Sequence, residues 1–337
     1  MEHRTVRLER HGRVLLVRLH NPPRNLVDTT MVGDLTAVVR ALEADAGVRA
    51  VVITGDPHEE FAAHFDVGVI EELTRRVPGQ VPPTAARMLL SLVAGLEVLP
   101  GLGPLLARTP AAGAQAVLGM HRLFQRMGRS DKIFIAAVNG LALGGGCEIA
   151  LACDLRFMAE HDDCRIGLPE ALLGIIPGGG GTQLLTRAVG PARAMPLMLH
   201  GTALSAAEAL AEGIVHRAVP RNELLETALA TADRLALRSP WTVRMLKRSV
   251  YGGVGRSLGS GLALERSGLV AAATSAQGRR GMRTLLEMFP SDRPVPPGEL
   301  LAALGRTEID LGAATTVPQP HGTVATAVPE EGEEDGR

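Results

Sequence analysis

The chain has 337 residues, a formal net charge of −1, and only six Phe, one Trp and one Tyr. This length allows a large core spread over one to three domains. The near-neutral charge and the scarcity of aromatic side chains argue against a nucleic-acid-binding surface.

Further features of the composition concern compartment and metal binding. The N-terminus is polar and charged, unlike a signal peptide, and no uncharged apolar run reaches the roughly 20 residues of a membrane-spanning helix. The cysteines Cys147, Cys153 and Cys164 are odd in number and lack metal-ligand spacing. We therefore expect a soluble, cytoplasmic protein with reduced thiols and no metal.

The N-terminal third alternates strands with a helix. Residues 6–8 and 14–19 flank His11-Gly12 and predict a β-hairpin. Asp28 or Thr29 can cap a helix that runs to about Leu42 with one apolar face. Residues 48–54 predict a buried strand, and the alternation indicates α/β layers.

The central stretch, residues 132–183, carries two glycine clusters and two glutamates. Strands are predicted at 133–138 and 155–159, and a helix begins at Cys147, directly after the glycine triplet 144–146. Glycines before a helix bring bare N–H groups and a positive dipole end close to a ligand. With Glu148 and Glu170 nearby, this pattern indicates acid/base chemistry on a carbonyl that becomes an oxyanion.

The second glycine cluster, residues 178–181, lacks the lysine of a phosphate-binding GxxxxGK[ST] loop. We interpret it as tight packing of the turn that holds the Glu170 loop. Asp154 is predicted to fix the start of the following strand rather than to take part in chemistry.

The C-terminal half is predicted to be mostly helical. Helices are expected at 187–200, 204–211 and 222–237, with a short β element near 213–220. A further helix begins at Ser239 and carries Arg244, Lys247 and Arg248, which we interpret as a solvent-exposed basic stripe. Two more helices follow between residues 257 and 288.

From about residue 5 to about residue 290 the chain resembles the enoyl-CoA hydratase/isomerase (crotonase) family. The resemblance depends on segments in the family's order, namely IAAVNG, GGGCE, CD, PE and GIIPGGGGT. It implies an α/β fold, a crotonase-like spiral of ββα turns with a C-terminal helical oligomerisation region. We expect the spiral core in residues 1–255, the helical region in 256–300 and a disordered acidic tail in 301–337.

The resemblance also assigns site residues. It implies that Glu148 and Glu170 are catalytic and that the backbone N–H groups of Phe65 and Gly145 form the oxyanion hole. The remaining substrate- and CoA-binding positions that it implies are Arg24, Ala63, His64, Asp66 and Gly144.

The chain departs from the family in the segment 61–66, where relatives carry F-x-x-G-(A/G/S)-D. His64 occupies the place of the glycine and Phe65 the place of the small residue. Two interpretations of His64 stay open: a loop histidine without chemical role, or a residue that shapes the thioester pocket. Two interpretations of Arg24 also stay open: contact with CoA, or a solvated loop arginine. For the basic stripe at 244–248, contact with the CoA phosphates is a minor alternative to solvent exposure.

The implied activity is addition of water to a 2-enoyl-CoA, a step of fatty acid metabolism, in a homotrimer or homohexamer. CoA arrives as part of the substrate, and no separate cofactor is implied. Alternatives are a Δ3,Δ2-enoyl-CoA isomerase or another crotonase reaction, a non-catalytic acyl-CoA-binding protein, and RNA binding, which the charge disfavours.

An apolar insert at about residues 75–118 makes the chain longer than most relatives between residues 70 and 121. Pro100 and Pro104 lie within it. We hypothesise that it forms a mobile lid over the acyl pocket; the alternative is an additional packing or oligomer-contact element.

Overall fold

The computed structural model describes residues 3–56, 60–75, 77, 79–99, 101–106, 109, 111–289, 296 and 298. The expected acidic tail, residues 301–337, lies outside the described residues, as does part of the insert. None of the helices in these ranges is both long and apolar enough to cross a membrane.

A six-stranded sheet forms the centre of the molecule. Its strands, in spatial order, are β1 (Val6–His11), β2 (Val14–Leu19), β3 (Ala50–Gly55), β4 (Ile133–Val138), β6 (Leu155–Glu160) and β8 (Arg217–Pro220). The pair β1–β2 is antiparallel, which confirms the predicted hairpin, and all other pairs are parallel. The α/β fold class is therefore confirmed.

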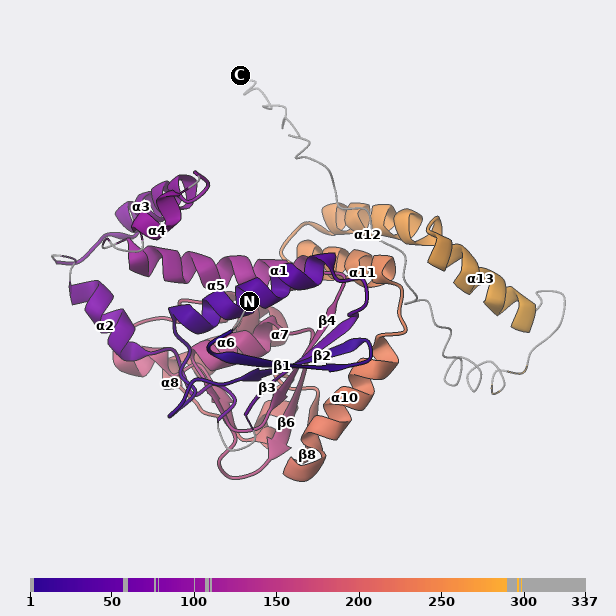
Figure 1. The fold of residues 1–337 in the computed structure, drawn as a ribbon, viewed down its shortest axis with the longest axis horizontal. Coiled ribbons are helices and arrows are strands. Elements are labelled where there is room, and N and C mark those ends of the chain that lie inside the picture. The colour runs from indigo at the N-terminus through magenta and orange to yellow at the C-terminus, as the bar shows by residue number, and fades with distance from the viewer. Residues whose placement is uncertain are drawn as a thin grey trace, which may run out of the picture.

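Helices cover both faces of this sheet (Figure 1). Helices α1 (Thr29–Ala44) and α5 (Ala112–Arg129) pack on each other, and α10 (Leu224–Leu235) packs against β3 and β4 on the other side. Every residue of β3 and β4 is buried, as expected of central strands in a parallel sheet. Asp28 caps α1 by accepting a hydrogen bond from the Met31 N–H at 2.7 Å, as predicted.

A second, smaller sheet lies beside the first and carries the glycine triplet. It pairs β5 (Leu141–Leu143) with β7 (Arg165–Gly167). Isolated bridges extend this layer from Ala62 to Ala142 and from Ile166 to Leu204, and a further bridge joins Val27 to Phe65. Segments far apart in sequence therefore meet where α6 (Gly145–Ala152) begins.

The remaining helices lie outside these two layers. They are α2 (Val67–Arg75), α3 (Pro83–Leu96), α4 (Leu102–Leu106), η1 (Glu170–Leu173), α7 (Gly181–Val189), α8 (Pro191–His200), α9 (Ala206–Ala211), η2 (Arg221–Glu223), α11 (Pro240–Gly253), α12 (Leu258–Ala273) and α13 (Ala276–Met288).

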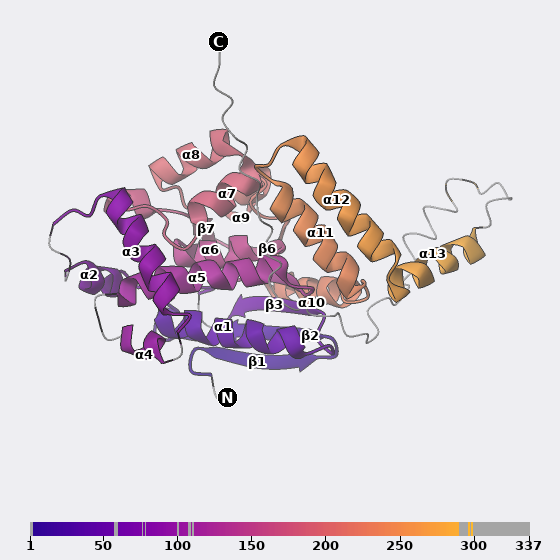
Figure 2. The same ribbon diagram turned by 90° about the horizontal axis from the view of Figure 1, so that it is seen from above.

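The described part of the insert is helical. Helix α3 packs against α5 (Figure 2) and buries Val93 there. Glu97, which follows α3, forms an ion pair with Arg122 of α5 and accepts a hydrogen bond from Gln115 at 2.9 Å. Whether the insert acts as a lid stays a prediction.

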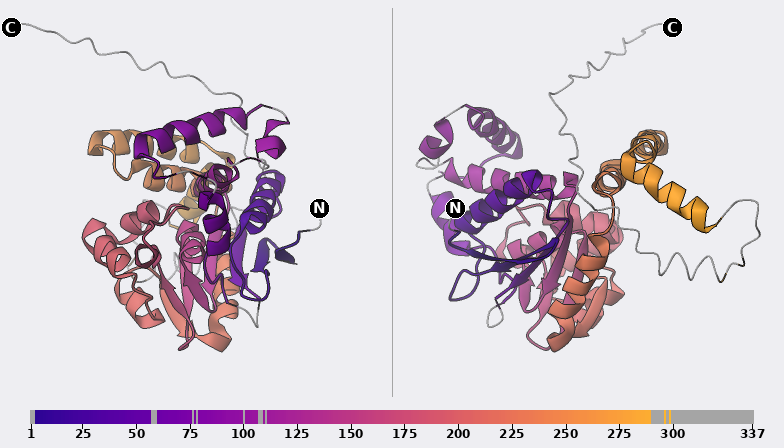
Figure 3. Two further views of the ribbon diagram at one scale, coloured as in Figure 1. Left: turned by 90° about the vertical axis from the view of Figure 1, so that its left-hand side faces the viewer. Right: turned by 45° about the vertical axis from the view of Figure 1, so that its right-hand side comes forward.

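The C-terminal helices stand apart from the sheet (Figure 3). Helix α12 packs along α11, and α13 continues away from the body of the molecule. Large apolar side chains on α12 remain exposed, including Leu258 and Leu269 at 78% and 68% of their surface.

The predicted solvent-exposed basic stripe on α11 is wrong for Lys247. Its ammonium group is buried, lies 2.6 Å from Asp154 and donates hydrogen bonds to the carbonyls of Met127 and Lys132. Asp154 also accepts a hydrogen bond from the Phe134 N–H, so it fixes β4 rather than only the start of β6. The local pattern missed this because the buried partners are distant in sequence.

Candidate active site

The glycine triplet forms the joint between β5 and α6. Gly144 has a positive φ of 48° and precedes the helix, which begins at Gly145 rather than at the predicted Cys147. A Cβ atom on Gly146 would lie 1.9 Å from the Ala62 carbonyl oxygen. Glycine is required here because the segment 62–65 packs directly on the helix start.

Two backbone N–H groups face the same region at this joint. A Cβ atom on Gly145 would lie only 3.3 Å from the backbone nitrogen of Phe65. The Gly145 N–H is the first of α6 and therefore has no acceptor inside the helix. Within the residues that the structure describes, neither the Phe65 nor the Gly145 N–H has a hydrogen-bond acceptor.

The orientation of the Phe65 N–H follows from its neighbours. Val27 donates to the His64 carbonyl at 2.9 Å and accepts from the Asp66 N–H at 2.8 Å. In a trans peptide the C=O and N–H groups point in opposite directions. The Phe65 N–H therefore points away from Val27, toward the glycine triplet.

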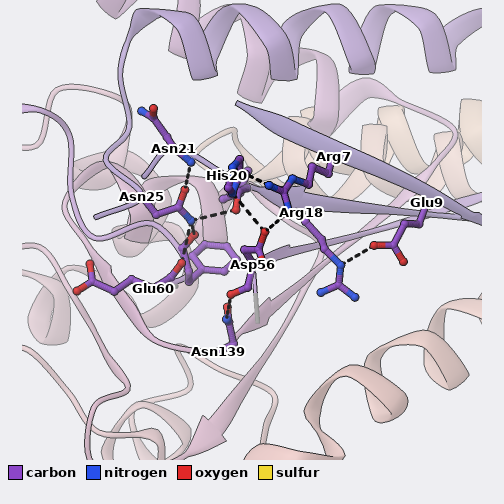
Figure 4. Close-up of polar contacts among 11 residues, drawn as sticks. Arg7, Glu9, Arg18, His20, Asn21, Asn25, Asp56, Glu60 and Asn139 are labelled. Carbon is purple, nitrogen blue, oxygen red and sulfur yellow. Dashed lines mark hydrogen bonds and ion pairs between the residues drawn. The ribbon is translucent and has the colours of Figure 1, made fainter. Parts of the chain in front are cut away.

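Asn25 anchors the segment that leads to Phe65 (Figure 4). Its side chain is fully buried, and its Nδ2 donates to the carbonyls of Glu60 and Phe61, each at 2.8 Å. Its Oδ1 accepts from the Asn21 N–H at 2.8 Å. Sequence reasoning considered only Arg24 in this loop; the signal for Asn25 was an asparagine at a turn, a residue that tolerates the observed positive φ of 50°.

Glu148 is held in a buried position on α6. Only 3% of its surface is exposed, and its Oε1 accepts hydrogen bonds from the N–H groups of Gly179 and Gly181 at 2.8 and 2.7 Å. Burial raises the pKa of Glu148, while the glycine N–H groups act to lower it. The second glycine cluster thus contacts Glu148 directly, a partner that our interpretation of a Glu170-holding turn missed.

Glu170 faces the same joint from η1. A Cβ atom on Gly144 would lie 3.0 Å from the Glu170 Oε1. The Glu170 Oε2 is buried and has no hydrogen-bond partner among the described residues. Burial raises the pKa of Glu170 to about 7, and the charge of Glu148 adds to this increase. Glu148 is therefore held by two N–H donors of the second glycine cluster, whereas the Oε2 of Glu170 has no donor among the described residues.

The other predicted binding residues lie along the loop before α2. Ala63 is buried and donates to the Asn25 carbonyl, His64 Nδ1 lies 2.7 Å from the Phe65 carbonyl oxygen, and Asp66 accepts from the Gly68 N–H. Arg24 is exposed and lies 3.9 Å from Glu60. The structure thus gathers Ala63, His64 and Asp66 in the loop before α2, whereas Arg24 lies in the segment between β2 and α1.

The site combines two unpaired N–H donors with two carboxyl groups that differ in their tendency to be protonated. An enzyme that performs acid/base chemistry on carbonyl compounds uses groups of these two kinds. The family model for enoyl-CoA hydratase/isomerase matches residues 102–292. The chain belongs to the enoyl-CoA hydratase/isomerase family.

Individual relatives agree with this assignment. A probable enoyl-CoA hydratase from Rhizobium meliloti is 34% identical over 79% of this chain and 88% of its own length. A short-chain-enoyl-CoA hydratase from Clostridium acetobutylicum is 32% identical over 79% and 88%. A solved enoyl-CoA hydratase structure from Geobacillus kaustophilus superposes with a TM-score of 0.68 at 31% identity, over 88% of this chain and all of that one.

Proposed function

We propose that the protein adds water across the double bond of a 2-enoyl-CoA thioester. The observation that carries this proposal is that Glu170 lies against Gly144, beside the Phe65 and Gly145 N–H groups that lack acceptors among the described residues, while the charge of Glu148 acts on Glu170. The similarity to enoyl-CoA hydratases supports the substrate class.

The oxyanion-binding step uses the two backbone donors. The thioester oxygen accepts hydrogen bonds from the Phe65 and Gly145 N–H groups, which stabilise the negative charge as the enolate forms. Each such donor typically contributes about 2.7–4 kcal/mol to lowering the barrier. Ala63, His64, Asp66 and Gly144 would surround the thioester, and Arg24 would contact the CoA moiety, which arrives as part of the substrate without a separate cofactor.

The proton transfers follow from the two carboxyl environments. Glu148, ionised and held by the glycine N–H groups, takes a proton from water as the hydroxyl oxygen bonds to the β-carbon. Glu170, protonated in its buried position, gives its proton to the α-carbon and the enolate collapses. The sum is addition of one water molecule, and solvent exchange restores both carboxyl groups.

Isomerisation of a 3-enoyl-CoA is the second candidate, since shifting a double bond requires only one carboxylate. The firm hydrogen bonding of Glu148 by Gly179 and Gly181 favours hydration, because an isomerase that relies on Glu170 alone has no use for a second oriented carboxylate.

The test is loss of enoyl-thioester ultraviolet absorbance with a panel of short- to long-chain 2-enoyl-CoA substrates. We expect Glu148→Gln to lower the rate by about 100- to 10,000-fold, since it removes the base and keeps an oxygen for the glycine N–H groups. No absorbance loss with any substrate, together with conversion of a 3-enoyl-CoA, would show that the isomerase assignment is correct instead.

A further inference from the structure

We propose that His64 is a positioning residue that fixes the Phe65 N–H in the oxyanion hole. This inference rests on the proposed function and adds a role for a side chain where the family pattern has none. Its basis is the contact between His64 Nδ1 and the Phe65 carbonyl oxygen at 2.7 Å.

The chemistry of this contact has only one arrangement. A carbonyl oxygen accepts and does not donate, so the His64 Nδ1 must carry the proton and donate it. Both the neutral Nδ1–H tautomer and the imidazolium ion provide this donor.

The hydrogen bond completes a clamp around one residue. The two peptide units that flank Phe65 contain four polar groups. Val27 binds the His64 carbonyl and the Asp66 N–H from one side, and the His64 ring binds the Phe65 carbonyl from the other. The remaining group is the Phe65 N–H, which has no acceptor in the described part of the chain.

The need for a clamp comes from the side chain of Phe65. The residue is half-buried and packs against the core, and a Cβ atom on Gly145 would approach the Phe65 Cβ to 3.1 Å. Any repacking of this large ring moves the backbone to which it is attached. Displacement of a catalytic group by about 1 Å can lower a rate by roughly 100-fold. The His64 hydrogen bond opposes such movement.

Three variants distinguish the effect of the His64 hydrogen-bond donor from the effect of the size of its ring. His64→Phe keeps a ring of similar size without the N–H, and His64→Asn places an amide N–H near the position of Nδ1. His11→Phe is the matched control, because His11 is exposed in the β1–β2 hairpin. Each would be assayed for hydration of a short-chain 2-enoyl-CoA.

The second readout is the absorption maximum of bound 4-(dimethylamino)cinnamoyl-CoA, which moves to longer wavelength as its thioester carbonyl is polarised. Because the wavelength comes only from folded, ligand-bound molecules, it stays informative if a variant folds poorly. We expect His64→Phe to show about half of the wild-type wavelength shift. Its kcat should fall about tenfold, which is part of the effect of losing an oxyanion-hole donor, and its KM should change by no more than about twofold. His64→Asn should recover most of the wild-type wavelength shift and most of the wild-type kcat. His11→Phe should match the wild type in both.

Two results would overturn this inference without affecting the proposed function. The first is a full kcat and a full spectral shift in His64→Phe. The second is an equal loss in His64→Asn and His64→Phe, which would assign the effect to the shape of the ring. A wild-type protein that neither hydrates an enoyl-CoA nor shifts the bound probe would instead overturn the proposed function.

Discussion

Glu148 and Glu170 have the same chemistry but different surroundings. Glu148 accepts two backbone hydrogen bonds, which favour its charged form, whereas the buried Oε2 of Glu170 has no donor among the described residues. Hydrogen bonds to a carboxylate favour ionisation and burial opposes it. Burial raises the pKa of both groups, and the glycine N–H donors oppose this increase at Glu148, which supports the proposed roles of Glu148 as base and Glu170 as acid.

The proposed acid role of Glu170 predicts a pH limit. With a pKa of about 7, Glu170 is protonated below neutral pH and loses its proton above it. The kcat/KM of hydration should therefore fall roughly tenfold per pH unit above about 7. The measurement is kcat/KM between pH 6 and 9. Glu170→Gln should lower the activity and remove this fall in kcat/KM above pH 7. A wild-type kcat/KM that stays constant between pH 6 and 9 contradicts the assignment.

A substitution at Gly179 is predicted to displace the carboxylate of Glu148. A Cβ atom there would lie 2.3 Å from the Glu148 Oε2 and 2.4 Å from the Met120 Cε. Gly179→Ala should therefore displace the carboxylate and lower kcat by at least about tenfold. Gly178→Ala is the matched control, since nothing lies within 4 Å of its Cβ position. Equal rates in the two variants would show that Glu148 tolerates the added methyl group.

Local sequence patterns could indicate the candidate residues but not their partners. Glu148 lies two residues after the glycine triplet, so its place in a helix start could be predicted from adjacent residues. Its hydrogen bonds come from Gly179 and Gly181, more than 30 residues away. Likewise, Asn25 binds carbonyls 35 and 36 residues further along the chain, which no short-range pattern contains.

At the level of secondary structure, α11 is fixed to the sheet by a buried ion pair. Lys247 and Asp154 compensate each other's charge, and Tyr251 donates a further hydrogen bond to Asp154 at 2.8 Å. Lys247→Met leaves Asp154 without its counter-charge and should lower the free energy of unfolding by about 3 kcal/mol. Denaturant unfolding would measure this. Arg248→Met changes an exposed side chain of the same helix and should have little effect; similar losses in both would mean that the ion pair contributes nothing specific.

The insert offers a prediction about substrate length. Helix α3 is attached to α5 through Val93 and Glu97, while Met88, Leu89 and Leu92 remain exposed. If these side chains contact long acyl groups, Leu89→Gln with Leu92→Gln should lower kcat/KM for long-chain substrates by at least about tenfold, since each substitution removes apolar burial worth up to about 1.5–3 kcal/mol. A short-chain substrate is the internal control. Equal changes for all chain lengths would favour a packing or oligomer-contact role.

At the scale of the whole molecule, the alternation of strands and helices was enough to predict α/β layers. The predicted strands at 133–138 and 155–159 match β4 and β6 to within one residue. The order of the strands could not be predicted in the same way, because β3 pairs with β4 across the entire insert. The site depends on this long-range order, since the small sheet joins residues 62, 142, 166 and 204.

The exposed apolar residues of α12 carry the prediction about assembly. Leu258, Leu262 and Leu269 lie on one side of the helix and are 78%, 40% and 68% exposed. Exposed apolar patches of this kind mark protein interfaces. The family resemblance implies a homotrimer or homohexamer, and we predict that its interface buries this patch. Leu262→Glu with Leu269→Glu should reduce the mass in light scattering to that of one chain, 35.4 kDa.

Ser267→Glu is the matched control for this change. Ser267 is exposed on the same helix and, at 100° per residue, lies about 160° around it from Leu269 and about 140° from Leu262, so the added charge faces away from the patch. Its mass should equal that of the wild type. An unchanged mass in the double variant would exclude this face of α12 from the interface. A monomeric double variant that retains full kcat would show instead that assembly occurs through α12 and that each chain forms a complete active site alone.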